Sequence, residues 1–130
     1  MSFLEKYTEQ SYAFMRILAA LLFMFHGAQK ILGFMPKYPP PEIGSQLWIG
    51  GMIELIAGLM IAIGFRTRWA AFISSGTMAV AYLQFHWALK TGPEFFPANN
   101  GGDAAILYAL IFLFVACRGA GIWSLDNRNA

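Results

Sequence analysis

The sequence predicts an all-α protein, a four-helix transmembrane bundle with both termini in the cytoplasm. Its composition is the first reason, because hydrophobic residues make up 58% of the 130 residues and charged residues only 12%. An ordinary soluble domain has about 25% charged residues, so half that share indicates that lipid is the solvent. Four long apolar segments and an uneven distribution of basic residues are the second and third reasons.

The predicted spans cover residues 12–34, 47–65, 69–89 and 104–122 of a single membrane domain, residues 1–130. A membrane-spanning helix needs about 20 apolar residues, and the first three segments meet this requirement. The fourth is uninterrupted only from Ala104 to Cys117, so we expect it to be short, tilted or continued through the sequence GAGIW. A soluble bundle is disfavoured because so small a chain could not cover four apolar helices in water.

The connections between the spans are rich in proline, glycine and basic residues. The stretch PKYPPPEIGSQ after the first span cannot be helix interior, because proline lacks an N–H and clashes with the preceding turn. The sequence RTR predicts a tight turn between the second and third spans. The stretch KTGPEFFPANNGG leads to the fourth span, with Asn100 or a neighbour as its N-cap.

Basic residues set the expected orientation of the chain. Four spans place both termini on one side, with Lys6, Arg16, Arg66, Arg68, Arg118 and Arg128, whereas Lys30, Lys37 and Lys90 lie on the other. Basic residues favour the cytoplasmic side, so both termini are predicted to be inside. All four tryptophans lie near predicted span ends, where interfacial aromatic residues gather.

The alternating directions of the spans bring ionisable side chains from all four to a similar depth in the outer half of the bundle. The candidates for ligand binding or proton transfer are His26, Lys30, Glu54, Tyr82, His86 and Asp103. A charge at the centre of a spanning helix costs about 2.5–3.5 kcal/mol, so Glu54 must be protonated or paired with Lys30 or a histidine. The spacing of Gly50, Glu54, Gly58 and Ala62 predicts a small-residue stripe for close helix contact.

The polar layer has four interpretations. A quinone or quinol site needs a histidine or carboxyl group at each ring oxygen, aromatic walls, and side chains that move protons. Alternatively, the layer only hydrogen-bonds the helices to one another. Haem or another metal held by His26 and His86 is a third interpretation, and a proton or small-solute pathway is the fourth.

Other classes of site find no support in the sequence. The single cysteine, Cys117, excludes an internal disulfide and a thiolate metal cluster. A net charge of +2 without a basic stripe argues against nucleic acid as a partner. No residue can be named as catalytic from its sequence pattern.

A second polar set lies at the predicted cytoplasmic end and is expected to be structural. It comprises Arg16, Arg68, Arg118 and Asp126. Arg16 lies about one turn into the first span and is expected to pair with Asp126 or with freed carbonyl groups. Arg66 and Arg68 are expected to anchor lipid phosphates at a basic inner surface.

Two stretches, GGMIELIAGLMIAIGFRTRWAA (residues 50–71) and NNGGDAAILYALIFLFVACRGAGIWSLD (residues 99–126), resemble the DoxX family of small four-span bacterial membrane proteins. The stretch RILAALLFMFHGAQKILG (residues 16–33), in the first span, is similar to that family's pattern of arginine, glycine and lysine. The residues that match the family pattern are Arg16, Gly27, Lys30, Glu54, Gly58, Gly64, Arg68, Asp103, Gly119, Gly121, Ser124 and Asp126. At Asp103 the family commonly has glutamate.

The resemblance implies a multi-pass protein of the bacterial inner membrane that is associated with quinol oxidation or redox homeostasis. If the protein is an enzyme, it is expected to be a subunit of a quinone-linked oxidoreductase. Its expected partners are the lipid bilayer, a membrane or peripheral redox protein, and further copies of itself. A non-enzymatic assembly subunit is the competing expectation.

Overall fold

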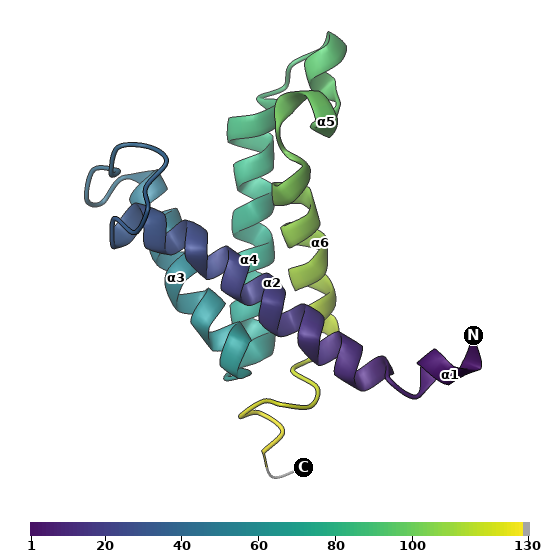
Figure 1. Cartoon of the computed structure of the whole chain (residues 1–130). Helices are drawn as coiled ribbons and strands as arrows, with labels where there is room; N and C mark the ends of the chain where they lie inside the picture. The colour runs from purple at the N-terminus through teal and green to yellow at the C-terminus, as the bar shows by residue number, and fades with distance from the viewer. Residues whose placement is uncertain (129–130) are drawn as a thin grey trace.

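The computed structural model describes residues 1–128 and confirms an all-α fold with four main helices (Figure 1). These are α2 (Thr8–Ile31), α3 (Gln46–Ile63), α4 (Thr67–Ala81) and α6 (Asp103–Arg118). Shorter elements are α1 (Ser2–Glu5), the π-helix η1 (Tyr82–Trp87), the 3-10 helix η2 (Gly92–Phe95) and α5 (Pro97–Asn100).

The four main helices form two pairs. α2 packs mainly against α3, and α4 packs mainly against α6, while a tight turn joins α3 to α4. Figure 1 shows α4 and α6 side by side, with α2 crossing obliquely in front of them. The pairs lie together near the C-terminal tail and diverge toward the opposite end, which carries the 32–45 loop and the η2–α5 segment.

Two of the helices are long and apolar enough to cross a bilayer. They are α2, with a mean hydropathy of 1.4 over its most apolar window, and α3, with 1.8. α4 has 15 residues and is continued by the six of η1, whereas α6 has 16 and ends at Arg118. The sequence GAGIW is therefore not helical, and the fourth segment is short. The crossing of all four segments and the cytoplasmic position of the termini remain predictions.

Apolar side chains cover the outside of the helices, and several polar ones lie inside. Large exposed residues include Phe14, Phe72 and Leu107, which come from three different main helices. The buried polar residues are Arg16, Glu54, Thr67 and Ser74. A monomeric soluble protein rarely exposes so much contiguous apolar surface, so this distribution agrees with a lipid environment.

Glycines allow the backbones of α2 and α3 to approach closely. A Cβ on Gly27 would lie 2.6 Å from the amide nitrogen of Leu55, and one on Gly58 would lie 2.5 Å from the Cγ of Met24. Gly58 thus packs against α2, as the predicted small-residue stripe requires. Gly50 does not, because a Cβ there would meet nothing within 4 Å in the described chain. Gly51 makes the contact with α2 instead, opposite the Cβ of Lys30.

The third segment changes its helical form at the end far from the C-terminal tail. After Ala81 the chain continues as the π-helix η1, and the left-handed residues Ala88 and Leu89, with φ of 51° and 58°, end it. Gln84 in η1 and Gln46 at the start of α3 donate amide hydrogen bonds to each other, 2.6 and 3.0 Å long. This amide pair joins the start of α3 to the end of the third segment.

Candidate functional site

A large cleft lies where the two helix pairs diverge. Its volume is about 1130 Å³, and its walls come from α2, α3, α4, η1, α6 and the 32–45 loop. The lining is mostly apolar, and its titratable side chains include His26, Lys30, Glu54, His86 and Tyr108. An apolar pocket with a few convergent polar groups is the usual form of a small-molecule site.

An ion pair between α2 and α3 forms the most buried polar part of the cleft. The Nζ of Lys30 donates a 2.8 Å hydrogen bond to the Oε1 of Glu54. Glu54 is only 4% exposed, whereas the side chain of Lys30 is 34% exposed. The other carboxyl oxygen, Oε2, is buried and has no hydrogen-bond donor among residues 1–128. The sequence left Lys30 or a histidine open as the partner of Glu54, and in the structure the partner is Lys30.

His26 and Tyr108 form an aromatic wall beside this ion pair. Their ring centroids are 6.2 Å apart and the rings meet edge to face. Tyr108 also stacks on Phe112, at a centroid distance of 5.8 Å and an interplanar angle of 11°. Sequence reasoning missed Tyr108, although it carries the one hydroxyl in the apolar run of residues 104–117.

The other predicted site residues divide between the cleft and its surroundings. His86, on η1, lines the same cavity as His26, Lys30 and Glu54. Tyr82 packs instead against Gly102, where a Cβ would lie 2.5 Å from its ring, and its hydroxyl accepts a 3.3 Å hydrogen bond from Asn100. Asp103 is exposed in the first turn of α6. These two residues lie outside the described lining of the cleft.

The described residues offer few ligands for a metal ion. Within residues 1–128, no group of three or more histidine, cysteine, aspartate or glutamate side chains lies close enough to hold a metal ion. Ligation by His26 and His86 alone is the arrangement that the sequence left open, and both of these histidines line the cleft.

The opposite end of the bundle is held together by the C-terminal segment, residues 119–128, which we call the tail. Arg16 is fully buried and donates from Nη1 to the carbonyl of Ile61 (3.2 Å) and from Nη2 to those of Trp123 (2.8 Å) and Ile122 (3.3 Å). Its partners are therefore freed carbonyl groups, one of the two possibilities that the sequence left open. A Cβ on Gly64 would lie 2.7 Å from Nη1 of Arg16, so glycine is needed there.

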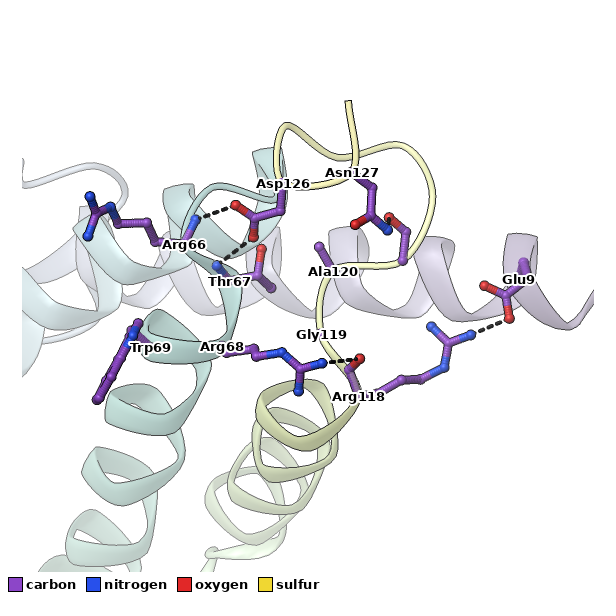
Figure 2. Close-up of a pocket in the computed structure, with 11 residues that line it drawn as sticks. Glu9, Arg66, Thr67, Arg68, Trp69, Arg118, Gly119, Ala120, Asp126 and Asn127 are labelled. Atoms are coloured by element: carbon purple, nitrogen blue, oxygen red, sulfur yellow. Dashed lines mark hydrogen bonds and ion pairs between the residues drawn. The ribbon is translucent and has the colours of Figure 1, made fainter. Parts of the chain in front are cut away.

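Charged side chains cap two helices at this tail end (Figure 2). Arg68 donates to the carbonyls of Ala116, Cys117 and Arg118, which are the last turn of α6. Asp126 accepts hydrogen bonds from the backbone N–H groups of Arg66 (2.8 Å) and Thr67 (2.9 Å), at the start of α4. A cap of this kind satisfies backbone groups that a helix end leaves free.

A second cavity, of about 640 Å³, lies among these capping residues. Arg118 forms an ion pair with Glu9 and lies 4.0 Å from the ring centroid of Tyr12, and Figure 2 shows Arg66 directed away from Asp126. Most of the polar groups that line this cavity form hydrogen bonds or ion pairs within the chain. The tail end therefore has the geometry of a structural joint.

The caps give one prediction about pH. Desolvation acts to raise the pKa of Asp126, but the hydrogen bonds from Thr67 and Arg66 and the nearby Arg16 charge outweigh it, and its pKa is lowered. A lowered folded-state pKa contributes stability above about pH 4, and this contribution is lost as the pH falls through the folded-state value.

We therefore expect Asp126→Asn to unfold at a lower temperature than the wild type at pH 7. The difference should disappear at a pH below the folded-state pKa, because the wild-type carboxyl is then protonated. Thermal unfolding of both proteins in the same detergent at the two pH values measures this. A difference that does not change with pH would contradict the capping role of the carboxylate.

Comparison with known proteins shows the family of the chain. A family model described as DoxX matches residues 11–87. An uncharacterized protein of Haemophilus influenzae is 42% identical over 135 residues, which cover 98% of this chain and 97% of that protein. No solved structure matches the chain. The family match confirms the resemblance seen in the sequence, and the chain belongs to the DoxX family of membrane proteins.

Proposed function

We propose that the cleft binds the ring of a quinone or quinol and that the side chains around Glu54 assist its proton transfer. The observation that carries the proposal is the buried carboxyl of Glu54, whose Oε2 has no donor among residues 1–128 although it lies in the wall of a 1130 Å³ cavity. A buried polar atom without a partner is costly, and a ligand that hydrogen-bonds to it removes that cost.

The residues in the cleft fit such a ring. A quinone carbonyl accepts hydrogen bonds, which Lys30, Tyr108 or a protonated histidine can donate, whereas a quinol hydroxyl donates one, which Oε2 of Glu54 can accept. His26 and Tyr108 supply an aromatic wall on one side, and His86 and Phe85 line the other part of the cavity.

Reduction of a bound quinone takes up electrons and protons in equal number. The chain's own residues would donate and accept the protons, because Glu54 and His26 are titratable groups next to the expected position of the ring. The electrons would come from a membrane or peripheral redox protein. We propose that this complex lies in the bacterial inner membrane, with the chain as its quinone-binding subunit. The exposed apolar surface would also bind further copies of the chain.

A second candidate function is that of an assembly subunit without a ligand. The observation that favours it is the 2.8 Å Lys30–Glu54 pair, which joins α2 to α3 beside the close contacts of Gly27 and Gly51. In that case the polar layer only fixes the register of the two helices.

The two candidates are separated by what the protein carries from its native membrane. The protein is purified under mild conditions and extracted with organic solvent, and the extract's absorption spectrum is recorded before and after chemical reduction. We expect a quinone band that changes on reduction, and less quinone per protein in Glu54→Gln. Glu94→Gln, a change at an exposed acid, is the matched control and should keep the wild-type ratio.

Two outcomes would overturn the proposal. An extract without quinone, together with equal behaviour of Glu54→Gln and the control in a quinone-binding assay, would favour the assembly role. A Soret band in the spectrum of the intact protein would instead favour haem held by His26 and His86.

A further inference from the structure

Part of the cleft is lined by apolar residues of α3 and α4, and we call this part the groove. Two glycines, Gly50 on α3 and Gly76 on α4, line it. The branched apolar side chains beside these glycines are those of Ile49, Ile53, Ile73 and Val80, which line the same cavity. The cavity thus has both the Glu54–Lys30 pair and apolar side chains in its walls.

The two glycines leave space that no other part of the described chain fills. A Cβ at Gly50 or at Gly76 would meet no other part of residues 1–128 within 4 Å, apart from its own helix and chain neighbours, whereas one at Gly27 would lie 2.6 Å from a backbone nitrogen of α3. Glycine in a helix interior is less favourable than alanine by roughly 0.5–1 kcal/mol. Helix packing requires the glycine at position 27, but it does not explain those at positions 50 and 76.

We propose that the groove holds the hydrocarbon tail of the ligand, so the ligand is a long-tailed, lipid-soluble quinone. This inference rests on the proposed function, because it places the ring of the same molecule against Glu54. Glu54 itself also indicates a ligand, since it is 4% exposed and its Oε2 has no partner among residues 1–128. A molecule with a polar ring and an apolar tail complements a cavity whose walls hold an unpaired buried carboxyl oxygen and apolar side chains.

The size of the cavity agrees with such a molecule. Pockets for drug-sized ligands measure roughly 300–1000 Å³, and this cavity measures about 1130 Å³, which is more than a single ring needs. In a bilayer the tail leaves one apolar medium for another, so its contribution comes from close packing in the groove and not from escape from water.

Filling the groove tests the inference. The variants Gly76→Leu and Gly50→Leu put a side chain into space that is empty of protein atoms, and leucine favours helix more than glycine does. We therefore expect their unfolding temperatures to equal or exceed that of the wild type. Leu107→Phe, which adds bulk at an exposed position of α6 outside the described lining, is the control.

The binding assay compares two quinones with the same ring in lipid nanodiscs, one with a long isoprenoid tail and one without a tail. We expect Gly76→Leu and Gly50→Leu to bind the long-tailed form more weakly by roughly tenfold or more, the effect of overfilling a packed cavity. The tailless form should bind to both variants and to the control as it does to the wild type.

The outcomes separate this inference from the proposed function. If both variants bind the long-tailed quinone as the wild type does, or lose both forms equally, the tail does not lie in the groove. The proposed function would survive that result. If the wild type binds neither form, the proposed function itself fails and the tail site fails with it.

Discussion

Replacing Arg16 by methionine is expected to lower the free energy of unfolding by about 3 kcal/mol, because hydrogen bonds to a charged group contribute roughly 1.5–3 kcal/mol each and their acceptors remain buried. The guanidinium of Arg16 serves three carbonyl groups, one at the end of α3 and two in the tail. Its loss leaves the tail without its main attachment to α2.

Thermal or denaturant unfolding in detergent measures this effect, with Lys6→Met as the control, because Lys6 is an exposed residue with the same charge. Arg16→Lys should recover little of the stability, since an ammonium group cannot reproduce the planar fork of donors. Equal stability of Arg16→Met and Lys6→Met would show that the tail is held by other contacts.

Lys30→Met is expected to have a comparable effect, because it leaves the buried carboxylate of Glu54 without its counter-charge. Removing one partner of a buried ion pair costs about 3–5 kcal/mol, and the exposure of Lys30 places this case near the lower end. The double variant Lys30→Met/Glu54→Gln removes both charges and should recover much of the loss.

The chain offers a matched control for this pair. Lys90 and Glu94 also form a 2.8 Å ion pair, but their side chains are 55% and 53% exposed. Lys90→Met should therefore cost less than about 1 kcal/mol. If Lys30→Met and Lys90→Met reduce the stability equally, the Lys30–Glu54 pair is not the desolvated pair described here.

The same double variant also bears on the two candidate functions. An assembly subunit whose polar layer only joins α2 to α3 should keep its function in a double variant that folds normally. A quinone-binding subunit should bind the ring more weakly and lose its proton transfer in that variant, because an amide does not exchange the proton and methionine donates no hydrogen bond.

Much of the cleft could be predicted from the sequence, because antiparallel helices bring residues at matching distances from their ends to one level. This reasoning placed His26, Lys30 and Glu54 together, and the Lys30–Glu54 hydrogen bond joins two of them. The glycine stripe of α3 was wrong at Gly50, because a strict four-residue spacing drifts around a helix of about 3.6 residues per turn, so Gly51 shares the face of Gly58 instead.

The positions of Tyr82 and His86 could not be predicted in this way. Both lie in the π-helix η1, whose turns differ from those of α4, so α-helical spacing along α4 does not give the directions of their side chains. Tyr82 therefore packs on Gly102 while His86 lines the cleft. The partners of Arg16 were equally hidden, because they are backbone carbonyls of a segment whose path depends on where α6 ends.

Photolabelling tests the central claim, that the cleft between the helix pairs holds a quinone ring, most directly. The protein in lipid nanodiscs is irradiated with a quinone that carries a photoreactive group on its ring, and the labelled residues are located by mass spectrometry. We predict labels on cleft-lining residues of α3, α6 and η1, and their loss when unlabelled quinone is added in excess. Labels confined to the exposed apolar surface, or unaffected by the competitor, would contradict the account.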